Sequence, residues 1–151
     1  AGDARDNIVP QGTDFGYYDR GTPGTSHQLQ RIDFSNDTAT ATGRGPTTPN
    51  IYRASAVSSA SHGYFAGGQD YGGPAPNPVL SRVDRIDYNN DTATALAKGP
   101  LSLLSYSLAA TGNNSFGYFA GGRRAGMPPE TSRVDRIDYS NDTATASPKG
   151  L

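Results

Sequence analysis

The sequence of 151 residues contains no cysteine, which excludes disulfides, thiolate metal sites and cysteine nucleophiles together. It has a single glutamate, Glu130, and only two lysines, so aspartate and arginine carry most of the charge. Lysine and glutamate favour helices whereas aspartate favours caps and turns, so the charged residues argue against helices. No apolar run approaches the roughly 18 residues of a membrane-spanning helix, and no basic-then-apolar signal segment is present. We therefore expect a soluble chain that is mostly β-structure.

Large aliphatic side chains are scarce too. Leu, Ile, Val and Phe together make up 23 of the 151 residues, about 15%, below the roughly 20% at which disorder has to be considered. Disorder also requires a high net charge, and the formal net charge here is −1. Nine tyrosines and five phenylalanines supply large side chains for a core. The composition therefore favours an ordered fold that needs little aliphatic core, and the near-zero charge gives no support for nucleic-acid binding.

What the sequence does contain is an internal repeat. The segment SRVDRIDYNNDTATA at 81–95 recurs at 132–146 with a single difference, and a weaker copy occupies 28–41. A second marker keeps the same order and spacing, as FGYYDRG at 15–21, HGYFAGG at 62–68 and FGYFAGG at 116–122. Two markers repeated three times in the same order predict three copies of one unit of about 50 residues. We place the units at 1–46, 47–100 and 101–151.

Each unit is consistent with four short strands joined by turns. The first strand is a run of small residues, and the second is the aromatic GYF segment, closed in two units by a double glycine that favours positive φ. A loop rich in glycine and proline leads to the third strand, VDRIDY, and the SND or NND triplet that follows is an Asx-type turn signal. We expect the fourth strand to start at the Thr-Ala-Thr-Ala alternation and to end at Lys98-Gly99-Pro100 in the second unit or at Lys149-Gly150 in the third. Four strands per unit fit the blade of a β-propeller.

The order of these segments resembles the kelch repeat, in which a strand with a Tyr-Asp turn precedes a short strand, a small-residue strand and a strand ending in double glycine. The double glycine and the Asp turn are present, but the kelch tryptophan is absent, and Thr38, Thr92 or Thr143 follows the turn instead. The GYFAGG and VDRIDYSNDTATA units are also similar to repeat proteins encoded by marine cyanobacterial phages. These resemblances imply an all-β fold of three kelch-like four-stranded propeller blades, with a structural role in a virion appendage or an extracellular filament.

Three blades are too few to close a propeller, because such rings contain four to eight. Each terminal blade would leave a face of Tyr, Phe and Ala open to water, and such a face is an association surface. We therefore expect a homo-oligomer in which further blades complete a ring or an array, with other protein subunits or glycans as further partners. We expect no cofactor, no enzymatic activity, no nucleic-acid or membrane partner, and an extracellular or virion location.

The repeated turn carries oxygen-bearing side chains at the alternating spacing found in calcium-binding loops. The weak calcium candidates are Asp87, Asn89 and Asp91 in the second unit and Asp138, Ser140 and Asp142 in the third. The calcium pattern also requires a glycine and a distal glutamate, and neither follows. A hairpin turn held by Asp and Asn oxygens is therefore the favoured interpretation.

Arginine and aspartate alternate in the third strand of each unit, as Arg31 with Asp33, Arg85 with Asp87 and Arg136 with Asp138. Residues at positions i and i+2 of a strand share a face. Equivalent residues on adjacent blades are therefore expected to form Arg–carboxylate pairs. Because the pattern repeats in every unit, a structural role is favoured over the alternative, an anion or sugar site.

The loops after the GYF strands differ between units, and variable loops on a constant scaffold are where recognition is expected. The candidates for contact with a ligand or partner are Tyr71, Arg123, Arg124 and Met127. A role as spacers or as contacts between stacked subunits is an equal alternative. The two histidines, His27 and His62, have no companion at metal-ligand spacing, and no Gly-x-Ser-x-Gly elbow is present.

Overall fold

The computed structural model describes residues 9–11, 14–19, 28–47, 51–72, 74, 77–124 and 130–150. Within these residues the fold is all-β, as the sequence predicted, and its helical segments are short 3-10 turns. The sheets comprise three four-stranded antiparallel sheets and one two-stranded antiparallel sheet. None of the helical turns in this part of the chain has the length and apolar character needed to span a bilayer.

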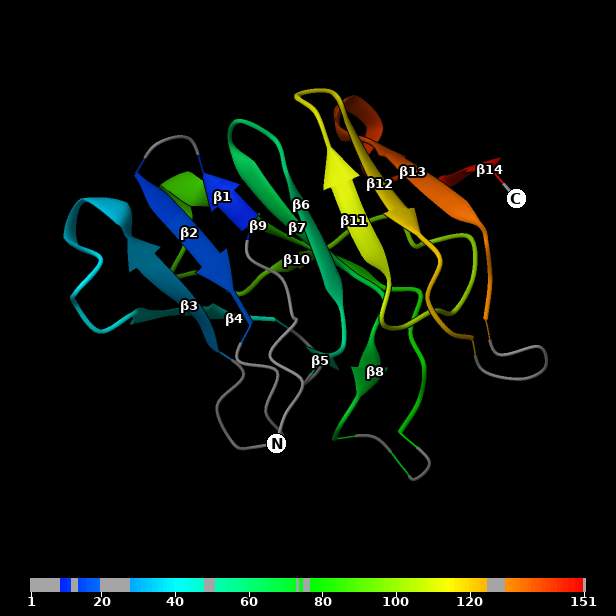
Figure 1. The fold of residues 1–151 in the computed structure, drawn as a ribbon, viewed down its shortest axis with the longest axis horizontal. Coiled ribbons are helices and arrows are strands. Elements are labelled where there is room, and N and C mark those ends of the chain that lie inside the picture. Colours follow the sequence, from blue (N-terminus) through cyan, green and yellow to red (C-terminus); the bar gives the residue numbers. More distant parts are fainter. Residues whose placement is uncertain are drawn as a thin grey trace.

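The three larger sheets follow one another along the chain (Figure 1). The first contains β1 (Val9–Gln11), β2 (Phe15–Tyr18), β3 (Gln28–Asp33) and β4 (Thr42–Pro46). The second contains β6 (Ser55–Ser58), β7 (His62–Ala66), β9 (Val83–Asp87) and β10 (Leu96–Ala97). The third contains β11 (Ala109–Gly112), β12 (Phe116–Ala120), β13 (Val134–Asp138) and β14 (Ser147–Gly150). The small sheet pairs β5 (Ile51–Tyr52) with β8 (Gln69–Asp70).

The first and second strands lie within the predicted segments, and the third strands cover most of the VDRIDY motif. Each third strand ends at an aspartate whose carboxylate caps a 3-10 turn, namely η1 (Phe34–Asn36), η2 (Tyr88–Asn90) or η3 (Tyr139–Asn141). The Asp87 Oδ1, for example, accepts a hydrogen bond from the backbone N–H of Asn89 at 2.9 Å. The Asx-type turn predicted for this triplet is therefore confirmed.

The predicted start of the fourth strand at Thr-Ala-Thr-Ala is wrong, whereas its predicted end lies close to the ends of β10 and β14. In the second unit Thr92 lies in a turn, and β10 begins only at Leu96. The backbone N–H of Ala95 donates to the carbonyl of Pro46 in the first sheet, 2.9 Å away, instead of to its own sheet. The alternation therefore marks a segment that bonds to the neighbouring sheet, and the true fourth strands follow it.

The apolar core lies between the sheets. Tyr17 and Leu29 of the first sheet are buried against Phe65, Ile86 and Tyr88 of the second. A second cluster joins the second and third sheets and consists of Val57, Tyr64, Ala66, Val83, Leu101, Phe119, Ile137 and Ala146. Face-to-face packing thus fills the core with aromatic rings and alanines beside a small number of aliphatic side chains.

The first strands of the larger sheets lie next to one another, since β6 contacts both β1 and β11 (Figure 1). Each double glycine ends the second strand with left-handed backbone, with φ of 70° and 92° at Gly67 and Gly68 and of 65° and 81° at Gly121 and Gly122. Glycine adopts such angles without steric cost, so the positive φ predicted at these pairs is confirmed.

Candidate functional site

Asp91, which follows the 3-10 turn of the second sheet, reaches across to the first sheet. Its Oδ2 accepts hydrogen bonds from the Tyr17 hydroxyl at 2.8 Å and from the Arg31 guanidinium at 2.9 Å. The Nε of Arg44 lies 2.9 Å from the same oxygen. These partners come from β2, β3 and β4, one from each strand. A carboxylate of the second sheet is therefore held by three groups of the first.

Asp142 repeats this arrangement one sheet further along. Its Oδ2 accepts from the Tyr64 hydroxyl at 3.1 Å and from the Arg85 guanidinium at 2.7 Å, and the Lys98 Nζ lies 3.3 Å from Oδ1. Tyr64 and Arg85 face each other directly in the β7–β9 pair, as Tyr17 and Arg31 do in β2–β3. We call each set of one tyrosine, one arginine and a second cation a carboxylate cradle.

The cradles are largely shielded from water. The side chains of Asp91 and Asp142 are 10% and 8% exposed. Burial together with the hydrogen bond to Asp91 raises the pKa of Tyr17 to about 12, and burial together with Asp142 raises the pKa of Tyr64 to about 12. Burial by itself would raise the pKa of Asp142, but the neighbouring Lys98 and Arg85 outweigh it and hold that pKa below its usual range. The Asp142 carboxylate is therefore an ionised acceptor between the sheets, and the hydroxyls of Tyr17 and Tyr64 keep their protons.

Aromatic stacking and backbone contacts accompany each cradle. The ring of Tyr17 stacks on Tyr88 with centroids 5.1 Å apart, and Tyr64 stacks on Tyr139 at 4.8 Å. The N–H of Gly99 donates to the carbonyl of Asp142 at 2.8 Å, and Gly45 makes the same bond to Asp91. Each sheet-to-sheet contact is thus built from the same ion pairs, stacked rings and backbone bond.

A side chain at the glycine of this contact would collide with the next sheet. A Cβ at Gly99 would overlap the backbone carbonyl of Ala144, and a Cβ at Gly45 would overlap that of Ala93. These glycines are required for close approach rather than for an unusual φ.

The weak calcium candidates are divided between two roles. Asp87 and Asp138 cap their own turns through the N–H of Asn89 and Ser140, while Asp91 and Asp142 point into the cradles. Across the described residues, no three His, Cys, Asp or Glu side chains gather as metal ligands would. The carboxylate oxygens of Asp87 and Asp138 therefore hold turns, and those of Asp91 and Asp142 hold the contacts between sheets.

The Arg–carboxylate contacts between sheets involve a different aspartate from the one predicted. The third-strand arginines Arg31 and Arg85 do pair with a neighbouring sheet, but with Asp91 and Asp142 of the turn. The predicted partners, Asp33 and its equivalents in the other two sheets, are occupied as turn caps instead.

An aromatic cluster lies at the end of the molecule that carries β5 and β8. Tyr71 is 43% exposed and meets Tyr52 edge to face, with ring centroids 5.8 Å apart. The guanidinium of Arg53 lies 5.2 Å from the Tyr52 ring centroid and 5.8 Å from that of Tyr106. We call Tyr52, Arg53, Tyr71 and Tyr106 the loop cluster. Sequence reasoning identified only Tyr71, although Tyr52 and Tyr106 occupy the same position of the repeat.

The other loop candidates lie at the edge of this cluster. The backbone of Arg123 pairs with that of Tyr106 in an antiparallel bridge, and its Nε lies 3.7 Å from Glu130 Oε1 in an exposed ion pair. Arg124 is half-buried. Met127 lies outside the described residues. The structure therefore connects Tyr71 and Arg123 through Tyr52, Arg53 and Tyr106.

The second sheet departs from the repeat at His62, which stands where the other sheets have Phe15 and Phe116. The His62 Nδ1 lies 2.8 Å from the Ser61 hydroxyl, and both residues line a pocket of 320 Å³ that also contains Arg85 and Tyr139. Burial lowers the pKa of His62, and the charge of Arg85 lowers it further. The neutral imidazole is thus favoured at this point between the second and third sheets.

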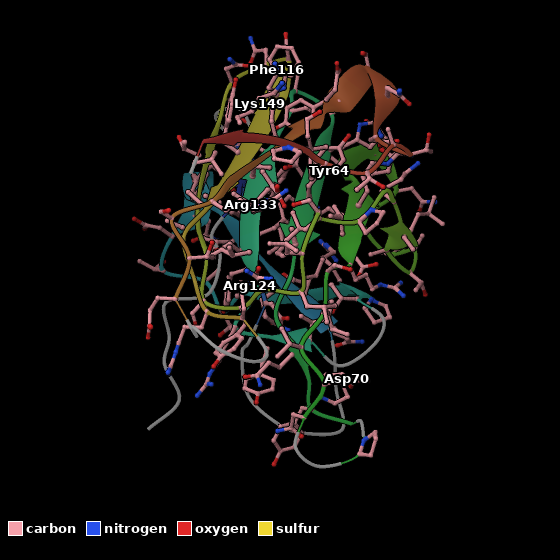
Figure 2. All side chains as sticks on the ribbon, turned by 90° about the vertical axis from the view of Figure 1, so that its right-hand side faces the viewer. Tyr64, Asp70, Phe116, Arg124, Arg133 and Lys149 are labelled. Atoms are coloured by element: carbon pink, nitrogen blue, oxygen red, sulfur yellow. The ribbon has the colours of Figure 1, made fainter. Side chains whose placement is uncertain are left out.

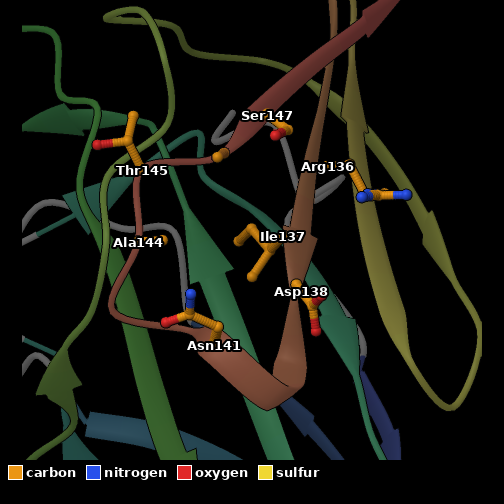
Figure 3. A pocket seen from close by; sticks show the side chains of 8 residues that line it. Arg136, Ile137, Asp138, Asn141, Ala144, Thr145 and Ser147 are labelled. Carbon is orange, nitrogen blue, oxygen red and sulfur yellow. The ribbon is translucent and has the colours of Figure 1, made fainter.

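A further pocket of 170 Å³ lies between β13 and the turn that precedes β14 (Figure 3). It is lined by Arg136, Ile137, Asp138, Asn141, Ala144, Thr145, Ala146 and Ser147. Arg136 extends from β13 away from this turn, and its guanidinium lies 4.3 Å from the centroid of the Phe116 ring on β12 (Figure 3).

Asp84 on β9 gives the stability of the fold a pH dependence. Its side chain is fully buried, and burial raises its pKa to about 6 even though Arg82 Nε lies 2.6 Å away. Because this folded pKa exceeds the unfolded value near 3.8, the folded state binds the proton more tightly, and the contribution of Asp84 to stability falls as the pH rises from about 4 to about 6. Asn cannot titrate, so we expect Asp84→Asn to remove this pH dependence of stability. The unfolding free energy of wild type minus that of the variant should then fall by roughly 2–3 kcal/mol from pH 4 to pH 7. Urea unfolding of both proteins at both pH values measures this difference. If the difference is the same at pH 4 and pH 7, the raised pKa of Asp84 is contradicted.

No protein-family model and no curated protein sequence matches the chain. Among solved structures, the chain is similar to one described as "Structure of YjhT", with a TM-score of 0.71 and 16% sequence identity. The match covers 95% of this chain and 44% of that chain, so this chain spans less than half the length of the protein it matches. A similarity at this identity shows a shared fold alone.

Proposed function

We propose that this chain is a non-enzymatic assembly protein whose three kelch-like propeller blades form a building block of a virion appendage or an extracellular filament. The observation that carries the proposal is the difference between joined and open sheet faces. Phe34 of the first sheet occupies the repeat position of Tyr88, yet Phe34 is 43% exposed and Tyr88 only 8%. The first sheet thus presents to solvent the ring that the second sheet buries against its neighbour.

The blade assignment rests on the sequence repeat together with the arrangement of the sheets. Each larger sheet is a four-stranded antiparallel meander, the sheets pack face to face, and their first strands lie together. This arrangement is typical of propeller blades, which close into rings of four to eight. Three blades leave two terminal faces, and association through such faces suits a repeating structural element.

Imaging tests this proposal. We expect negative-stain micrographs of the purified chain to show closed rings or ordered fibres without any added ligand. Particles that remain single three-bladed units at every concentration would contradict an assembly role.

A second candidate function is carbohydrate or protein binding by the loop cluster. Exposed tyrosine rings next to a guanidinium offer stacking surfaces and charged donors, the combination on which a sugar ring or an aromatic peptide side chain would bind. The exposed ring of Tyr71 beside Tyr52 and Arg53 is the observation that favours it.

For this second function we expect Tyr71→Ala to abolish binding on a glycan array, because the exposed ring supplies the stacking surface. The control is Leu96→Ala, which truncates a 60% exposed residue on β10 outside the cluster. Equal binding by both variants would exclude the loop cluster as the sugar site.

A further inference from the structure

The contact between sheets has two halves, and the two ends of the molecule each carry one half without its complement. In the two contacts within the chain, the earlier sheet supplies a carboxylate cradle and the later sheet supplies an aspartate. The third sheet is not followed by another within the described residues, and the first is not preceded by one. Among the described residues, the cradle of the third sheet therefore has no aspartate, and the aspartate of the first sheet has no cradle.

The open cradle consists of Tyr118, Arg136 and Lys149, the repeat equivalents of Tyr64, Arg85 and Lys98. Tyr118 and Arg136 face each other in the β12–β13 pair, with the same register as in the other two cradles. Lys149 is exposed on β14, on the side of the molecule that faces the viewer in Figure 2. No carboxylate of the described residues pairs with these three side chains; the Nε of Arg136 has no hydrogen-bond partner there, which is also true of the Arg85 Nε in the filled cradle.

The complementary half lies on the first sheet. Asp37 follows the 3-10 turn at the position of Asp91 and Asp142, but its side chain is exposed and no described side chain binds it. The apolar residues around it are uncovered as well. Tyr18, Ile32 and Ala41 are partly exposed, whereas their equivalents in the third sheet, Phe119, Ile137 and Ala146, are 1%, 3% and 4% exposed.

We propose that the open cradle of Tyr118, Arg136 and Lys149 receives Asp37 from a second copy of this chain, so that copies associate head to tail through the contact that already joins successive sheets. This inference rests on the proposed assembly role and specifies its contact. The charges are complementary, since one anion meets two cations, as in both contacts within the chain. A head-to-tail contact of this kind produces a closed ring or an open fibre, depending on the rotation between copies.

The remaining parts of the contact are also available at the two ends. Phe34 occupies the repeat position of Tyr88 and Tyr139, each of which stacks on a tyrosine of the preceding sheet. Phe34 would stack in the same way on Tyr118 of the other copy. Gly150 stands where Gly45 and Gly99 allow a carbonyl to approach, and among the described residues the nearest atom to a Cβ built on it is Val134 Cγ2 at 3.4 Å. The space beside Gly150 is thus free for the carbonyl of Ala39, the equivalent of Ala93 and Ala144.

Reversing one charge tests the contact. We expect Asp37→Lys to weaken self-association, measured by sedimentation equilibrium, by roughly 100-fold, because it sets a cation against two others. Lys149→Asp weakens it as well, since it sets one carboxylate against another. The double variant with Asp37→Lys and Lys149→Asp restores the opposite charges. We expect it to self-associate at least roughly tenfold more tightly than Asp37→Lys alone. The substituted side chains are exposed in the single chain, so the fold is preserved.

Two further variants complete the test. Asp70→Lys makes the same change in charge on β8, at the opposite end of the view from Phe116 in Figure 2, and is expected to associate like wild type. Gly150→Ala leaves the single chain intact but fills the space for the incoming carbonyl, so it is expected to abolish association. If wild type associates and both Asp37→Lys and Gly150→Ala do so equally well, the proposed contact is wrong while the assembly role stands. If wild type does not associate at all, both are wrong.

Discussion

Asp142→Ala is expected to lower the free energy of unfolding by about 2–3 kcal/mol, because it leaves Tyr64, Arg85 and Lys98 buried or half-buried without their common acceptor. The value lies at the low end for a broken buried pair, since the side chains of Arg85 and Lys98 keep 23% and 14% exposure. Because the pKa of Asp142 is lowered in the fold, its contribution is present above the usual carboxylate pKa near 4 and is lost as the pH falls through the folded value. The variant should therefore approach wild type in strong acid.

The matched control is Asp37→Ala, which makes the same substitution at the same position of the repeat. Asp37 is exposed and has no partner among the described side chains, so the unfolding free energy of the single chain should change by less than about 0.5 kcal/mol. Denaturant unfolding at a concentration where the chain is monomeric compares the two. Equal losses would mean that the cradle contributes nothing to the joining of the sheets.

Gly99→Ala is expected to be the most damaging single-methyl change in the second sheet. The added Cβ overlaps the carbonyl of Ala144, and a backbone carbonyl in a packed sheet contact cannot rotate away as a flexible side chain could. Separating the sheets would also break the backbone bond from Gly99 to Asp142. We expect a loss of roughly 3 kcal/mol or more, measured by urea unfolding.

Gly150→Ala again provides the comparison within the same molecule. A Cβ at this position has room, since the nearest atom in the described part of the chain lies at an ordinary contact distance of 3.4 Å. The single chain should therefore tolerate alanine at 150 and not at 99. If both substitutions are tolerated, close approach of a carbonyl is not what requires glycine at this position.

Much of the fold could be predicted from the sequence because the repeat carries local signals. The GYF segments and the VDRID motifs mark the second and third strands, and the SND triplets mark turns whose hydrogen bonds stay within two residues of Asp33, Asp87 and Asp138. These features depend on neighbours in the sequence. The start of the fourth strand was misplaced because Ala95 bonds to Pro46, a residue of another unit that no local pattern indicates.

The site could be predicted only in part, for the same reason. The sequence pattern assigns the oxygens of Asp91 and Asp142 to their own hairpin turn, with calcium as the weaker alternative, whereas their hydrogen-bond donors lie 57 to 78 residues away in sequence. The loop cluster was identified by Tyr71 alone. Tyr52 and Tyr106 precede the first strands of their sheets and lie outside the variable loops, so loop variability does not indicate them.

The central claim is that the contact joining successive sheets also joins copies of this chain. The most direct measurement is the molar mass of the wild-type chain in solution, by sedimentation equilibrium over a wide range of concentration. We predict twice the 15.8 kDa of the single chain, or a higher multiple of it. A mass of 15.8 kDa that persists up to about 1 mM would mean that any contact is weaker than about 4 kcal/mol, and it would contradict the claim.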